Sequence, residues 1–110
     1  MAKSRLWLPK FCGSRKWEKI YDGNLCDGDY LEFSNHFRKD GIDFSITISL
    51  QNDWLHVVVC PVQNPYEKLT RCLVIENQSD LERVLMDLEI EFCARTSWKL
   101  TSDQSDFYSA

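Results

Sequence analysis

The sequence predicts an α+β domain in which an antiparallel sheet of about five strands carries one main C-terminal helix on one face. Two observations support this prediction. Several short stretches before residue 76 alternate or are rich in β-forming residues, and one stretch near residues 80–93 has helical periodicity. Strands that precede a helix favour an antiparallel layer over parallel strand–helix–strand units. We expect residues 1–100 to form a single domain and the polar residues 101–110 to be a frayed tail.

The clearest strand is 44–50, because apolar side chains alternate with Ser45, Thr47 and Ser49. The turn "QND" joins it to 54–60, which is apolar on both sides apart from His56 and is therefore expected to be more central. A third strand is predicted at 69–75. Weaker strands are predicted at "KWEKIY", "DYLEF" and, as an added edge, "TSWKL". The Asp-Gly pairs that start at Asp22, Asp27 and Asp40 predict turns.

The helix is expected to begin at a capping box formed by Ser79 and Glu82. Its apolar residues recur with the spacing of one helical face and predict a stripe that covers the sheet: Leu81, Val84, Leu85, Leu88 and Phe92. On the wet face, Arg83 and Asp87 have the spacing of an ion pair.

Charge is distributed unevenly along the chain. The net charge is −4, yet the first twenty residues hold six basic residues against Glu18 alone, so the remainder is strongly acidic. Such asymmetry concerns partners and steering rather than fold. The longest apolar run, 57–60, is far too short for a membrane helix, and the N-terminus lacks the pattern of a secretory signal. The protein is therefore expected in the cytoplasm, with no membrane partner.

The five cysteines form no C-x-x-C pair and are odd in number, so we expect free, buried thiols. No sequence motif of a nucleotide site, a zinc protease or a serine hydrolase is present, and no metal or cofactor is implied. His36 is expected to be solvated in a polar loop, and His56 to be a core or sheet-face residue. The chain is therefore predicted not to be an enzyme. A small enzyme with a Cys–His site assembled in space is retained as an alternative.

The stretch "YDGNLCDGDYLEF" concentrates carboxylates, glycines and tyrosines in residues 21–33. It fails as a calcium loop, because Asp27 stands where that loop needs glycine and Phe33 where it needs glutamate. Ordinary turn chemistry is one interpretation. The other is a contact surface for a cationic protein, since tyrosine beside carboxylate suits such a surface. The residues predicted to bind the partner are Asp22, Asp27, Asp29, Tyr30 and Glu32.

The basic N-terminal stretch interleaves Lys and Arg with Trp7, Phe11 and Trp17. This composition could serve a nucleic-acid-associated regulatory domain, with cations for phosphate and aromatics for stacking. The sequence pI near 5.1 makes nucleic acid an unlikely partner. The competing interpretation is a first strand whose aromatic side chains pack inward.

Taken together, the sequence predicts a small acidic protein-binding module. Its most concrete form is an immunity or antitoxin-type inhibitor that neutralises a basic toxin, possibly a nuclease, by stoichiometric binding. Size, charge and the lack of catalytic motifs support this prediction. An acidic inhibitor gains fast, steered association with a cationic target.

Overall fold

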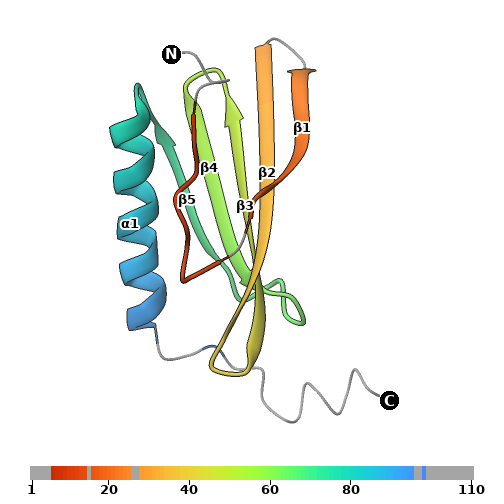
Figure 1. The fold of residues 1–110 in the computed structure, drawn as a ribbon, viewed down its shortest axis with the longest axis vertical. Coiled ribbons are helices and arrows are strands. Elements are labelled where there is room, and N and C mark those ends of the chain that lie inside the picture. Colours follow the sequence, from red (N-terminus) through yellow and green to blue (C-terminus); the bar gives the residue numbers. More distant parts are fainter. Residues whose placement is uncertain (1–5, 15, 26–27, 96–97, 99–110) are drawn as a thin grey trace.

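The structure is a computed structural model that describes residues 6–14, 16–25, 28–95 and 98. Five antiparallel strands follow one another in the order β1-β2-β3-β4-β5, and helix α1 comes last (Figure 1). This arrangement confirms the predicted α+β class, with its antiparallel sheet and single C-terminal helix. The bounds are β1 Glu18–Leu25, β2 Gly28–Lys39, β3 Ile42–Gln51, β4 Trp54–Pro61, β5 Leu69–Val74 and α1 Gln78–Ala94.

One face of the sheet forms the core. Alternation along β3 and β4 sends every second side chain inward, and the register sets Ile46 opposite Val59 and Ile48 opposite Val57, all fully buried. The predicted stripe of α1 is buried too, as the helical period requires. Two strands of alternating pattern and one amphipathic helix therefore supply most of the core.

The N-terminal segment, residues 6–14, packs beside α1 on this same face rather than forming the expected first strand. Phe11 is fully buried, with its ring centroid 5.9 Å from that of Phe92 and 5.5 Å from that of Phe37. Cys12 and Gly13 have positive φ angles of 50° and 70°, so the chain reverses here and cannot continue as a strand. The inward packing of Phe11 agrees with that interpretation, but residues 6–14 do not form the strand that it included.

Strand β2 is much longer than the predicted "DYLEF". Its second half was taken for a polar loop, whereas Asn35 and Phe37 are buried and His36 and Arg38 are exposed, which is strand alternation. The pattern was hidden because a buried asparagine occupies an inward position. The Asn35 side chain accepts a hydrogen bond from the backbone N–H of His36 at 2.8 Å, which helps to satisfy this polar group where β2 extends beyond its pairing with β1.

The Asp-Gly pairs do not all make turns. Asp40 and Gly41 form the β2–β3 turn with positive φ angles of 54° and 78°, as expected for this dipeptide. Asp22 and Gly23 instead lie within β1. Of the third pair, Asp27 lies outside the described residues and Gly28 begins β2.

Helix α1 is capped two residues earlier than predicted. Its N-cap is Asn77, whose side chain accepts a hydrogen bond from the backbone N–H of Asp80 at 2.9 Å. The Asp80 side chain accepts from the N–H of Glu76 at 2.9 Å, so Asn77 and Asp80, rather than Ser79 and Glu82, satisfy backbone N–H groups at this end. Arg83 pairs with Asp80 at 2.7 Å and not with Asp87.

The cysteines that the structure describes are free, as expected, but they are not buried. Cys12 and Cys60 are partly exposed, and Cys72 and Cys93 are exposed. Cys26, residues 101–110 and most of the "TSWKL" stretch lie outside the described residues; Trp98 is described and packs against Phe44 and Phe92. Within the described chain, no helix is both long and apolar enough to cross a membrane.

Candidate functional site

The second face of the sheet, which we call the open face, carries polar and aromatic side chains in rows across the strands. Register places one row near the β1–β2 and β3–β4 turns, formed by Gly23, Tyr30, Gln51, Trp54 and Val74. The next row is formed by Tyr21, Glu32, Ser49, His56 and Cys72. Strands lie about 4.8 Å apart, so Tyr30 and Trp54, two strands apart, are separated by about 10 Å.

Tyr21, Tyr30 and Glu32 form a connected group on this face. The two tyrosine rings meet edge to face with centroids 5.6 Å apart, and the Tyr30 hydroxyl donates to Glu32 Oε1 at 2.8 Å. The Tyr21 ring lies over Gly23, where an added Cβ would be 3.4 Å from its hydroxyl, and that hydroxyl donates to the Asn24 carbonyl at 2.9 Å. The Tyr21 ring thus packs against the backbone of its own strand and against the Tyr30 ring.

The Tyr30 hydroxyl also meets Ser49 of β3. The hydrogen bond with Ser49 lowers the pKa of Tyr30, whereas burial and the bonded, negatively charged Glu32 raise it, and the net result is a raised pKa. The phenol therefore stays protonated at neutral pH and acts as a hydrogen-bond donor. Its bond to Glu32 fixes the position of a carboxylate on the open face.

Trp54 extends this group toward β5. It is 54% exposed at the start of β4, and its cross-strand neighbour Val74 is 55% exposed. We call Tyr21, Tyr30, Trp54 and Glu32 the aromatic patch. Exposed tryptophan and tyrosine are the side chains that most often dominate binding energy at protein interfaces.

Carboxylates surround the same end of the sheet. Asp29, Asp53 and Glu76 are exposed at the start of β2, in the β3–β4 turn and just before α1, and we call them the acidic rim. The backbone brings them together, because the N–H of Asn52 donates to the Asp29 carbonyl at 3.4 Å and that of Ile75 donates to the Asp53 carbonyl at 2.8 Å. A Cβ at Gly28 would overlap the Asn52 side chain, so the hairpin and the turn are in close contact.

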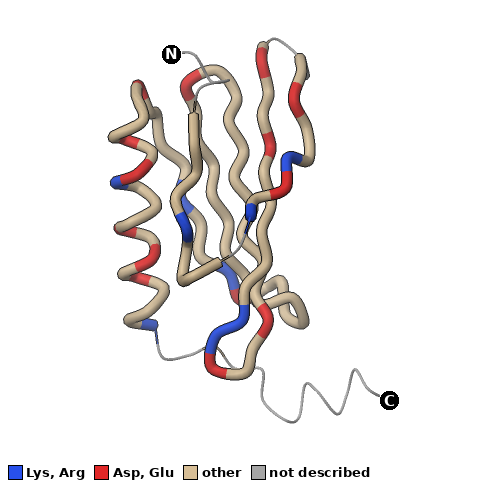
Figure 2. Tube along the Cα trace, viewed as in Figure 1, with Lys and Arg blue, Asp and Glu red and all other residues tan. Residues whose placement is uncertain are grey.

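Acidic residues occur at both ends of the sheet. Figure 2 shows Asp and Glu at the β1–β2 end, at the β3–β4 turn and along α1, and again at the opposite end, where they lie beside the Lys and Arg at the end of β2. No ion pair links Asp29, Asp53 or Glu76 to another described residue. A cationic surface would therefore meet uncompensated negative charge at the rim.

The five residues predicted to bind a partner are divided by the fold. Tyr30 and Glu32 lie together on the open face, within the aromatic patch. Asp22 lies directly opposite buried Leu31 on the neighbouring strand, and Asp29 is two residues before Leu31 on the same strand, so both are on the core face of the sheet. Asp22 forms an ion pair with Lys19 at 3.3 Å, and Asp29 is part of the acidic rim. Asp27 lies outside the described residues. The binding role of all five stays a prediction.

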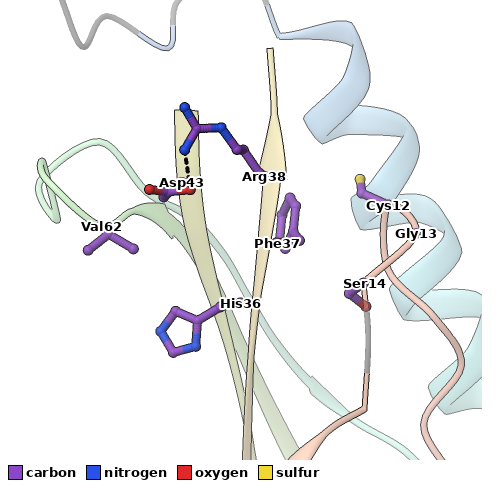
Figure 3. Close-up of a pocket in the computed structure, with 8 residues that line it drawn as sticks. All are labelled: Cys12, Gly13, Ser14, His36, Phe37, Arg38, Asp43 and Val62. Carbon is purple, nitrogen blue, oxygen red and sulfur yellow. Dashed lines mark hydrogen bonds and ion pairs between the residues drawn. The ribbon is translucent and has the colours of Figure 1, made fainter. Parts of the chain in front are cut away.

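A pocket of about 490 Å³ lies at the opposite end of β2, between the N-terminal segment and β3. Figure 3 shows the Cys12 thiol and the His36 ring on opposite sides of it, so they do not form a nucleophile–base pair. Burial, with further contributions from neighbouring Cys93 and Glu89, raises the pKa of Cys12 to about 12, which keeps the thiol protonated. Arg38 is paired with Asp43 at 3.1 Å. The pocket thus lacks an activated nucleophile.

Among the described residues, no three His, Cys, Asp or Glu side chains gather closely enough to hold a metal ion. The aromatic side chains of the basic N-terminal stretch are mostly engaged in packing: Phe11 is fully buried and Trp17 packs against the core, while Trp7 is 54% exposed. A stacking surface of three aromatics is therefore not available to single-stranded nucleic acid.

Comparison of the chain with protein-family models, with curated proteins and with solved structures finds no match.

Sequence reasoning missed Trp54, Asp53 and Glu76. The stretch 54–60 was interpreted as apolar on both sides, but Trp54 and His56 are exposed and Val58 and Cys60 are half-buried on the open face. The polar His56 was a signal of this alternation. The proximity of the rim carboxylates could not be found from spacing, because it depends on which turns share an end of the sheet.

Proposed function

We propose that this protein is a protein-binding module that uses the aromatic patch and the acidic rim to bind a cationic protein. The observation that carries the proposal is the position of exposed Trp54 and half-buried Tyr30 beside carboxylates without ion pairs to described residues, at one end of the open face of the sheet. Aromatic anchors supply buried apolar area, and surrounding charge steers the encounter. The most concrete form is a stoichiometric inhibitor of a basic toxin, of the immunity or antitoxin type.

Occlusion rather than chemistry is the proposed mode of action. A cationic partner would place apolar groups over Trp54 and Tyr30, and its lysines or arginines would meet Glu32 and the rim. Tyr30 holds the Glu32 carboxylate in place before binding, which lowers the entropy lost when the complex forms. The free thiols are compatible with action in the cytoplasm.

The proposal is tested by capture from a lysate of the native cells with immobilised wild-type protein, Trp54→Ala or Tyr66→Ala. Tyr66 is the matched control, since its side chain is 90% exposed in the β4–β5 loop at the far end of the sheet. We expect wild type and Tyr66→Ala to retain one basic protein in equal amounts and Trp54→Ala to lose at least about 90% of it, as for a hot-spot aromatic. Equal retention by Trp54→Ala contradicts the site.

The inhibitor role needs a second readout. The captured protein is produced alone and together with this chain in a test host, and growth is measured. Relief of growth arrest by wild type but not by Trp54→Ala supports inhibition, whereas a captured protein that is harmless by itself refutes the toxin-inhibitor role. Retention of nucleic acid instead of a basic protein at 50 mM salt contradicts the proposed partner class.

A further inference from the structure

Strand β5 forms an edge of the sheet and has unpaired backbone groups beside a groove. The N–H of Ile75 donates to the Asp53 carbonyl at 2.8 Å, so these two residues form a hydrogen-bonded pair at the end of β5. In an antiparallel ladder every second pair is hydrogen-bonded, so the backbone groups of Leu73 and Arg71 face β4. The backbone groups that face away from the sheet are those of Thr70, Cys72 and Val74. The Thr70 carbonyl accepts from the Arg71 side chain at 2.7 Å. No described strand pairs with the outward groups.

This edge lacks the usual protection against strand pairing. Natural edges are shielded by proline, by bulges or by charged side chains that project from the strand. Leu69–Val74 contains no proline, and its register with β4 has no bulge. Its single charge, Arg71, is turned toward α1 and paired with Glu91. The edge is therefore competent to accept another strand.

Helix α1 runs alongside β5 (Figure 1) and forms the second wall of the groove. The groove has a volume of about 380 Å³, with Leu73 and Val84 as apolar lining on its two walls. The Leu73 side chain is 43% exposed, although Leu73 pairs with buried Leu55 and so lies on the core face of the sheet. An edge strand beside a helix is an arrangement in which an extended peptide can form backbone hydrogen bonds and place alternate side chains in the groove.

The charges that line the groove select the chemistry of the peptide. Its two cations are engaged, since Arg71 pairs with Glu91 and Arg83 pairs with Asp80 at 2.7 Å. Glu76 and Asp87 line the same groove and pair with no described cation. A basic side chain is favoured there, and a second copy of this chain is disfavoured because two-fold pairing of β5 would bring two acidic grooves together.

We propose that the groove between β5 and α1 binds an extended segment of a partner protein by strand addition, and that this segment carries an apolar and a basic residue two positions apart, so that both side chains face the groove. Backbone groups of Cys72 and Val74 bond to the added strand, its apolar side chains contact Leu73 and Val84, and its cation meets Asp87. This site is separate from the aromatic patch and uses different side chains, so it goes beyond the function proposed above.

The test is selection of a displayed library of random decapeptides on the intact protein, followed by affinity measurement with the enriched peptides. We expect enriched sequences to carry an apolar residue two positions from a Lys or Arg. Cys72→Pro, which removes one outward N–H, should weaken their binding at least tenfold, and Asp87→Lys should do the same. Cys72→Ser keeps the N–H, and Glu18→Lys reverses a charge on the opposite edge strand, so both controls should bind as wild type does.

Amide hydrogen exchange gives a readout that does not depend on the proline variant. Peptide binding should slow exchange at Cys72 and Val74 at least tenfold while leaving the outward amide of Arg38 on β2 unchanged. The proposal is overturned if no peptide is enriched, if the enriched peptides lack an apolar and a basic residue two positions apart, or if they bind a folded Cys72→Pro protein normally. A dimer of the protein that Cys72→Pro dissociates would overturn it in favour of self-pairing.

Discussion

At the scale of single residues, the core depends on a cluster of aromatic rings that joins three parts of the chain. Phe92 of α1 is fully buried and meets Phe44 of β3 edge to face at 4.9 Å and Phe37 of β2 at 5.5 Å. Phe11 adds the N-terminal segment to the same cluster at 5.9 Å. These edge-to-face contacts add to the free energy gained from burying the rings. Phe92 is therefore the aromatic member of the buried stripe through which the helix packs on the sheet.

Phe92→Ala is expected to lower the free energy of unfolding by about 3–5 kcal/mol, because it removes a large side chain and leaves a cavity. Chemical denaturation followed by circular dichroism measures the change. Ile90→Ala is the control on the same helix, since Ile90 is 63% exposed, and it should cost less than about 0.5 kcal/mol. Equal costs for the two variants would mean that α1 is not docked as described.

The raised pKa of Cys12 makes its reactivity predictable. At pH 8 we expect iodoacetamide to modify Cys12 at least about tenfold more slowly than exposed Cys72, because the thiolate is the reacting form. Peptide mass spectrometry after timed quenching measures both sites. The contribution of this thiol to stability should be complete below its ordinary pKa of 9.0 and lost as pH rises toward 12. Rapid modification of Cys12 would instead revive a thiol-dependent activity.

At the scale of elements, the sequence predicted the strands and the helix in which apolar residues occupy the buried positions and polar residues the exposed ones. Strand β3 and helix α1 were found because their apolar positions follow periods of two and 3.6 without interruption. The second half of β2 was missed because Asn35 is buried at an inward position. The N-terminal segment was mistaken for a strand because its aromatic spacing does not reveal the left-handed turn at Cys12 and Gly13.

The structure identifies Asn77, rather than the predicted Ser79, as the N-cap residue of α1. Asn77→Ala should reduce the free energy of unfolding by about 1 kcal/mol, because it removes the acceptor of the Asp80 N–H. Ser79→Ala should change it by less than about 0.5 kcal/mol, since Ser79 is exposed and is not the cap. Thermal and chemical unfolding of both variants decide the matter, and a larger loss for Ser79→Ala would restore the predicted capping box.

The site was only partly predictable, and the reason is geometric. Tyr30 and Glu32 share a face because they are two residues apart on one strand, which the sequence could give. The presence of Trp54 beside them depends on the registers of β2 with β3 and of β3 with β4. The predicted acidic turn was treated as one surface, but strand alternation places Asp29 on the opposite face from Glu32.

At the scale of the whole molecule, the fold leaves one face of the sheet for binding. Helix α1 and the N-terminal segment cover the core face, and the described residues leave exposed aromatic side chains on the other. The turns at one end contribute the acidic rim, whose carboxylates pair with no described cation, while the opposite end mixes Lys and Arg with acidic residues (Figure 2). The rim carboxylates would attract a cationic partner before contact, and salt would weaken the effect over about 10 Å at 0.1 M.

The salt dependence of association with the captured basic partner tests the central claim most directly. Stopped-flow measurements at 50 and 500 mM salt compare wild type, the double variant Glu32→Gln/Asp53→Asn and the control Asp40→Asn at the opposite end of the sheet. The account predicts an association rate for the double variant at least about threefold lower at low salt, with a flatter salt dependence and an unchanged control. Identical rates and slopes for wild type and the double variant would contradict it.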